Sequence, residues 1–154
     1  MAWISLAIRK QSLKASVNEL TYQDIQLSRK VRSVHRHLSR EKAVYNADMK
    51  KELSAIKEVY MQVRNQRPAV DSEEYNQWRD ECNEAQEDYQ SYKQDIQDYF
   101  DDLNEEIEAE AQDEEDALQD QITETETQRD AQSAELQAVT DQIKSEIEGN
   151  TIKF

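Results

Sequence analysis

The sequence predicts an all-α protein, an elongated antiparallel hairpin of two long helices that pair like a coiled coil. The 154 residues include one Gly and one Pro, whereas β-sheet folds need turn residues about every 8–12 positions. Apolar residues make up 36% of the chain, too few for a thick globular core, which usually accompanies about 45–50%. These apolar residues recur at spacings of three and four, as in a helix that packs along one narrow stripe.

The first helix is expected over residues 3–66 and forms a basic arm. Its apolar stripe comprises Leu6, Leu13, Val17, Leu20, Leu27, Val31, Val34, Leu38, Tyr45, Met49, Leu53, Ile56, Tyr60 and Val63. Asp24 and Lys42 interrupt this stripe. Pro68 lacks an amide hydrogen and disfavours helical backbone at the residue before it, so a hinge is expected over residues 67–71.

The second helix is expected over residues 72–148 and forms an acidic arm. Asp71 and Glu74 have the spacing of a capping box at its start. Gly149 and Asn150 resemble a helix C-cap, which makes residues 149–154 a tail. The apolar stripe comprises Tyr75, Trp78, Cys82, Ala85, Tyr89, Tyr92, Ile96, Tyr99, Leu103, Ile107, Ala111, Leu118, Ile122, Leu136, Val139, Ile143 and Ile147. Residues 1–154 are therefore interpreted as one helical unit.

Charge is divided between the two arms. Residues 1–70 contain 14 Lys/Arg and 6 Asp/Glu, a net charge of +8, and residues 71–154 contain 5 Lys/Arg and 28 Asp/Glu, a net charge of −23. A turn centred near residue 69 places Tyr60 opposite Trp78, and it places basic residues opposite acidic ones. We expect ion pairs between the arms to fix this register. The residues expected in them are Arg29, Lys30, Arg32, Arg36 and Arg40 on the first arm and Asp101, Asp102, Glu105, Glu106 and Glu108 on the second.

The same register leaves apolar residues without a partner at the end opposite the hinge. Two helices that present one stripe each cannot bury all of them, and an apolar patch on a highly charged surface indicates a contact site. The predicted protein-contact residues are Trp3, Ile4, Leu6, Ile8, Val139, Ile143, Ile147, Ile152 and Phe154.

The sequence contains no recognisable catalytic, metal or cofactor pattern. His35 and His37 lie two residues apart and point about 200° away from each other on a helix, so they do not share a metal ion. The acidic run of residues 104–116 lacks the central Gly of a calcium-binding loop. The lone Cys82 falls on the apolar stripe, where a thiol acts as a small hydrophobe. We therefore expect no enzymatic activity, no cofactor and no metal centre.

Location and partners are constrained by the chain's polarity. The apolar residues 3–8 are followed at once by Arg9 and Lys10, so no cleaved signal peptide is expected. No stretch contains the roughly 18 apolar residues of a membrane span. The net charge of −15 argues against nucleic acid as a partner. A single Cys fits a reducing interior, or a virus particle assembled in one, so the predicted location is a virion or another intracellular assembly.

Two classes of function follow from these features. The first is a non-enzymatic structural or assembly protein, a coiled-coil spacer, connector or adaptor in a large complex such as a virion or a secretion apparatus. Its partners would be proteins, including copies of itself. The alternative is a soluble binding module, such as a chaperone, adaptor or inhibitor, whose acidic arm engages a basic protein or groove. The sequence also leaves open whether the arms pair within one chain or between chains.

Overall fold

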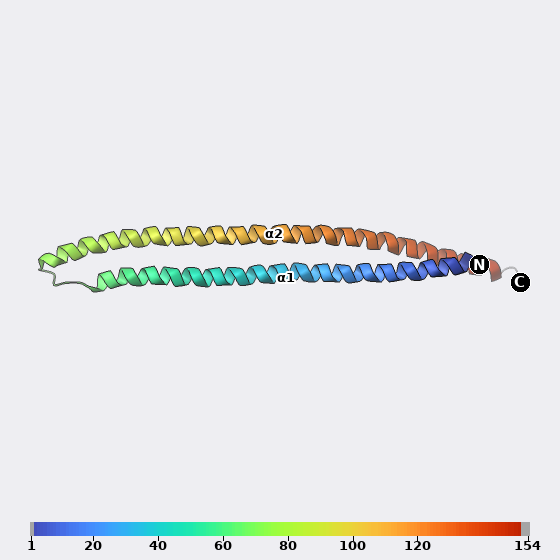
Figure 1. The fold of residues 1–154 in the computed structure, drawn as a ribbon, viewed down its shortest axis with the longest axis horizontal. Coiled ribbons are helices and arrows are strands. Elements are labelled where there is room, and N and C mark those ends of the chain that lie inside the picture. The colour runs from blue at the N-terminus through green and yellow to red at the C-terminus, as the bar shows by residue number, and fades with distance from the viewer. Residues whose placement is uncertain (1, 152–154) are drawn as a thin grey trace. The chain divides into compact units, whose positions relative to one another are not determined.

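The chain folds into two long α-helices in a computed structural model, which describes residues 2–151 (Figure 1). Helix α1 spans Ala2–Asn65 and helix α2 spans Glu73–Thr151. The described residues contain no strand. The expected all-α fold, a hairpin of two long helices that pack against each other, is therefore confirmed.

Helix α1 ends where the sequence places the hinge. Asn65 is its last residue, and the amide of Gln66 still donates a hydrogen bond to the Val63 carbonyl at 3.3 Å. Pro68 follows two residues later and has no amide hydrogen with which to continue this ladder. The connection between the helices consists of residues 66–72.

The start of α2 is organised by Ser72 rather than by Asp71. The Ser72 amide and hydroxyl both donate to the Ala69 carbonyl, at 3.0 Å and 2.6 Å. Glu73 and Glu74 then occupy the first turn of the helix, where their negative charge interacts favourably with the helix dipole. The expected capping box at Asp71 is thus replaced by a turn centred on Ser72.

The end of α2 differs from the expected cap. The helix continues through Gly149 and Asn150 to Thr151. Gly149 does not adopt a positive φ, so it does not form the left-handed C-cap that the sequence indicates. The rest of the expected tail, residues 152–154, lies outside the described residues.

The chain divides into two compact units, and the division runs through both helices. Unit 1 combines the described residues up to His35 with those from Gln112 onward, and unit 2 consists of Arg36–Ala111. Within each unit a segment of α1 runs antiparallel to a segment of α2 (Figure 1).

The apolar seam of unit 1 is well buried. Its buried apolar side chains are Leu20, Leu27, Val34, Leu118, Ile122 and Val139. All six belong to the stripes that the sequence predicts. Thr125, where the second stripe is poor in apolar residues, is buried as well.

The seam of unit 2 is more open, and it follows a different line on α2 from the expected one. Within unit 2 only Phe100 and Ile107 are buried, and Phe100 is just 3% exposed. Tyr99, which the sequence assigns to the seam, is 58% exposed and packs edge-on against Phe100 with a centroid distance of 5.3 Å. Tyr92 is likewise exposed. Two adjacent aromatics compete for one position, and the Phe ring, which has no hydroxyl to hydrate, takes the buried place.

The helices of unit 2 also pair in a different register from the expected one. Tyr60 stacks on Tyr89, with ring centroids 5.4 Å apart, instead of lying opposite Trp78. The cause is the connection, because extended chain advances about 3.3 Å per residue and a helix only about 1.5 Å. Residues 66–72 therefore carry the chain past the end of α1 before α2 begins (Figure 1). Trp78 instead donates from Nε1 to the Val63 carbonyl at 2.9 Å, which also accepts from the Gln66 amide.

Candidate protein-contact surfaces

The predicted contact residues of unit 1 are mostly at the surface. Trp3, Ile4, Ile8 and Ile147 are exposed, and Leu6 and Ile143 are half-buried. We call the four exposed side chains the terminal patch. They come from the first turns of α1 and the last turns of α2, which lie at the same end of unit 1 (Figure 1). Ile152 and Phe154 lie outside the described residues.

Val139 is the exception, because it is buried in the seam of unit 1. The expectation that it lacks a partner within the chain depends on the expected register, and that register is wrong. Arg9 donates to the carboxylate of Glu135, so the first turns of α1 pack further along α2 than a turn centred near residue 69 allows. This shift brings Val139 into the paired part of the seam.

The ion pairs between the helices involve a different set of residues from the predicted one. The observed pairs are Arg9–Glu135, Asp24–Arg129 and His35–Glu115 in unit 1 and Lys42–Glu108 in unit 2. Glu108 is the one predicted residue that takes part in an ion pair recorded among the described residues. The five predicted basic residues are all exposed. The register explains this outcome, since Lys30 lines a groove with Gln121 and Glu124 instead of facing residues 101–108.

Both polar interruptions of the first stripe find charged partners on α2. Arg129 donates from Nη1 to Asp24 at 3.1 Å, and the two side chains are only 27% and 18% exposed. Lys42 donates to Glu108. The partly buried Asp24–Arg129 pair disfavours slipped registers, because a slip places each charge against apolar side chains. The sequence identifies both interruptions, and their alignment with Arg129 and Glu108 was the signal for the true register.

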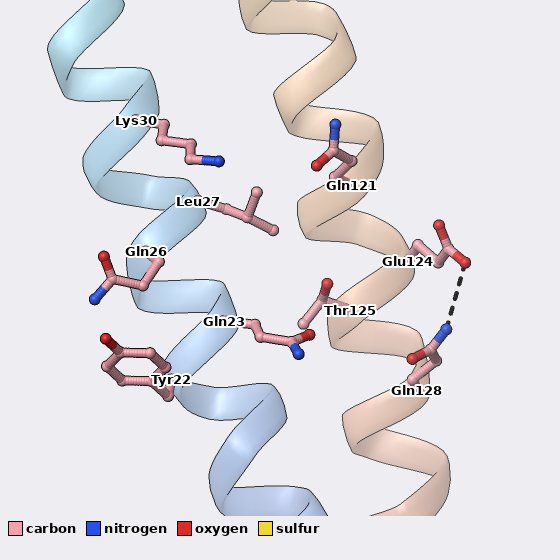
Figure 2. A pocket seen from close by; sticks show the side chains of 9 residues that line it. All are labelled: Tyr22, Gln23, Gln26, Leu27, Lys30, Gln121, Glu124, Thr125 and Gln128. Carbon is pink, nitrogen blue, oxygen red and sulfur yellow. Dashed lines mark hydrogen bonds between the residues drawn. The ribbon is translucent and has the colours of Figure 1, made fainter.

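A polar groove of about 420 Å³ lies in unit 1 beside Leu27 (Figure 2). The residues that line it are Tyr22, Gln23, Gln26, Leu27, Lys30, Gln121, Glu124, Thr125 and Gln128. In Figure 2 Gln23 points toward Thr125, and Gln128 donates to Glu124 at 3.3 Å. The lining mixes amide donors and acceptors with apolar surface in about equal parts, whereas small-molecule sites are mostly apolar with a few polar groups.

A second groove, of about 360 Å³, lies in unit 2 and is mainly apolar. It is lined by Ile56, Val59, Tyr60, Val63, Ala85, Asp88, Tyr89 and Tyr92. The stacked rings of Tyr60 and Tyr89 belong to this lining, while Val59 and Tyr92 are 63% and 57% exposed. The sequence pattern does not reveal this groove, because its spacing places Tyr92 in the seam and Val59 on neither stripe.

The groups with potential for metal binding or catalysis lie apart from one another. In the part of the chain that the structure describes, no three His, Cys, Asp or Glu side chains gather as metal ligands. His35 contacts Glu115 and His37 contacts Glu41, each at 3.3 Å. Cys82 is a free, half-buried thiol. Over residues 2–151, neither helix has an apolar stretch long enough to cross a membrane.

Comparisons with protein-family models, with curated proteins and with solved structures find no match for this chain.

Proposed function

We propose that the chain is a non-enzymatic structural or assembly protein, a helical-hairpin spacer, connector or adaptor in a larger complex such as a virion or a secretion apparatus. The observation that carries this proposal is the terminal patch. Trp3, Ile4 and Ile8 remain exposed within the first two turns of α1, although burying a large apolar side chain is worth about 1.5–3 kcal/mol. A patch of this kind is typical of a surface that another protein covers.

The packing of the two helices supports the same proposal. A seam between two helices leaves most side chains of each helix at the surface, and among the described residues only nine are buried. Such a molecule offers long helical faces to neighbouring proteins. Function in this proposal depends on contact rather than on an enclosed site.

The proposal is tested in the native cells or particles with a Trp3→Ser/Ile4→Ser variant of the full chain. We expect the wild-type chain to co-purify in fixed stoichiometry with a complex much heavier than 18.1 kDa. The double variant should be found largely outside that complex, while circular dichroism of the purified variant remains that of a helical protein. The matched control is Glu114→Gln/Asp120→Asn, which changes two exposed residues of α2 in unit 1 and should assemble normally.

The contrary result is equally clear. A wild-type chain found only in free form, or normal incorporation of the Trp3→Ser/Ile4→Ser variant, would contradict the structural role. Loss of incorporation in the acidic control alone would move the contact to the acidic face of α2.

The second candidate function is a binding module whose acidic arm engages a basic protein. It is favoured by the four exposed acids Asp101, Asp102, Glu105 and Glu106, which make no ion pair recorded among the described residues. Such a module would be found free in part and would bind one partner with strong salt dependence, because exposed charges are screened by salt. A structural subunit would instead stay in its complex as salt is raised.

A further inference from the structure

The apolar groove of unit 2 continues along the same face of the molecule. A third groove is lined by Tyr45, Asp48, Lys51, Glu52, Ala55, Tyr99, Phe100 and Leu103. Residues seven apart on a helix share a face. Val59 of the second groove and Glu52 of the third are seven apart, as are Tyr92 and Tyr99. The two grooves therefore follow one another between α1 and α2, and we call them together the hairpin groove.

The hairpin groove exposes large apolar side chains that the seam does not use. Val59, Tyr92 and Tyr99 are all more than half exposed. On α2, Tyr92 and Tyr99 form a second line beside the seam, because they lie next to the buried Phe100 line rather than on it. A helix with two adjacent apolar lines is typical of bundles in which it contacts more than one other helix.

Acidic residues border this second line. Glu81, Asp88, Asp95 and Asp102 are spaced seven residues apart along α2, and all four are exposed. Asp88 lines the groove itself, and Asp48 and Glu52 line it from α1 together with one basic residue, Lys51. Apart from a hydrogen bond from Gln77 to Glu81, none of the four has a polar partner recorded among the described residues. The apolar floor of the hairpin groove thus has a negatively charged rim.

We propose that the hairpin groove binds a basic amphipathic helix of a partner protein, which packs against unit 2 as a third helix. Apolar side chains of that helix, spaced three and four apart, cover Val59 and Tyr92 and reach toward Tyr99. Its Lys and Arg residues meet the Glu81–Asp102 line and lie over the tyrosine rings. The chain already makes such ring contacts itself, since the Arg64 guanidinium lies 5.9 Å from the centre of the Tyr60 ring.

Charge selects this occupant over a second copy of the chain. Residues 36–111 contain 10 Lys/Arg and 20 Asp/Glu, a net charge of −10. A second copy carries a net charge of −15 of its own, and like charges oppose association. A cationic helix gains from the same field, which also accelerates its encounter with the groove.

The inference deepens the adaptor form of the proposed function but uses a different surface from the terminal patch. The proposed structural function and the groove proposal can therefore be refuted independently. Trp3→Ser/Ile4→Ser should lose assembly yet keep full affinity for a basic helix. A variant of the hairpin groove should assemble normally yet bind a basic helix less tightly.

The test uses the full chain and a synthetic amphipathic peptide of about three heptads, with Leu on one face and Lys on its flanks. Binding is measured by the fluorescence anisotropy of the labelled peptide. Two control peptides carry Glu in place of Lys, or the same residues in an order that has no apolar face. We expect binding of the first peptide only.

Matched variants locate the binding site. Asp88→Asn/Asp95→Asn/Asp102→Asn and, separately, Val59→Gln/Tyr92→Gln should each weaken binding about tenfold, because several surface pairs or apolar contacts are lost at once. The control Glu87→Gln/Asp101→Asn/Glu105→Gln removes the same charge from other exposed positions of α2 and should change the affinity less than about twofold. All these substitutions are at exposed positions, so circular dichroism should remain unchanged.

Three outcomes would overturn the proposal. Equal loss in the two triple variants would mean unspecific attraction of a cation to an acidic surface. Unchanged affinity in Val59→Gln/Tyr92→Gln would remove the groove from the interaction. A groove variant that alters the oligomeric state of the chain without peptide would identify a second copy as the occupant.

Discussion

Units 1 and 2 are built from the same two helices, yet they use their apolar residues differently. Unit 1 buries six apolar side chains and encloses the Asp24–Arg129 pair in its seam. Unit 2 buries two and leaves Val59, Tyr92 and Tyr99 exposed around a groove. The seam residues of unit 1 are mostly Leu, Ile and Val, whereas unit 2 mixes Leu, Ile and Val with Tyr, Trp, Phe, Met, Cys and Ala. Aliphatic side chains close a two-helix seam, and a mixture of tyrosines and small residues leaves apolar surface for a further partner.

The largest expected effect tests the one deeply buried side chain of unit 2. Phe100→Ala should lower the free energy of unfolding by about 3 kcal/mol or more, the usual range for removing a buried ring. Tyr99→Ala should cost about 1 kcal/mol or less, since Tyr99 is mostly exposed. Urea titration followed by circular dichroism measures both values. A larger loss of unfolding free energy in Tyr99→Ala than in Phe100→Ala would mean that the seam follows the line that includes Tyr99.

The next comparison measures the difference between the two seams directly. Leu27→Ala in unit 1 should cost about 2–3 kcal/mol, because the side chain is buried. Leu53→Ala, which makes the same change at a half-buried position of unit 2, should cost about half as much. Equal losses in urea titrations of the two variants would mean that unit 2 is packed as firmly as unit 1.

A smaller effect is expected from the ion pair in the seam of unit 1. Asp24→Asn should destabilise the chain by about 1–2 kcal/mol, less than a fully buried pair, because both partners retain some exposure. The double variant Asp24→Leu/Arg129→Leu should recover most of that loss, since no charge is left without a partner. A double-mutant cycle with Asp24→Leu and Arg129→Leu gives the coupling energy, and a value near zero would show that the pair does not contribute.

The smallest effect is expected from the exposed basic residues. The charge pattern predicts ion pairs between the acidic arm and Arg32, Arg36 and Arg40. If these pairs formed, reversing the three residues to Glu would clearly destabilise the chain. The register seen here leaves all three exposed, so each reversal should change the free energy of unfolding by about 0.5 kcal/mol or less. Thermal melts of the triple variant at low and high salt distinguish the two expectations.

The sequence predicts the two helices well, apart from the caps of α2, because helix limits are mostly local. Pro68 ends α1 within three residues of its own position, and the spacing of apolar residues identifies the stripes except near Tyr92 and Tyr99. The register is not local, because it depends on the path of residues 66–72, which no periodicity describes. The wrong expected register is the reason why Val139 was predicted to lie at the surface and why the basic run was predicted to face the wrong part of α2.

Of the candidate surfaces, one was predicted from the sequence and the other was not. Exposure of Trp3, Ile4 and Ile8 agrees with the sequence analysis, and their role in contact stays a prediction. The hairpin groove was missed because Tyr92 and Tyr99 lie one residue away from the true seam, a difference that spacings of three and four do not resolve. The regular seven-residue spacing of Glu81, Asp88, Asp95 and Asp102 beside them was the available signal.

The Trp78–Val63 hydrogen bond has a consequence for how the two arms find each other. It joins residues 15 positions apart, whereas the Arg9–Glu135 pair joins residues 126 positions apart. Closing the longer loop from the open chain costs about 2 kcal/mol more in chain entropy. We therefore expect the arms to zip together from the connection outward. The folding nucleus would then form in the unit with the weaker packing, where early contact is entropically cheapest, and unit 1 would lock the hairpin afterwards.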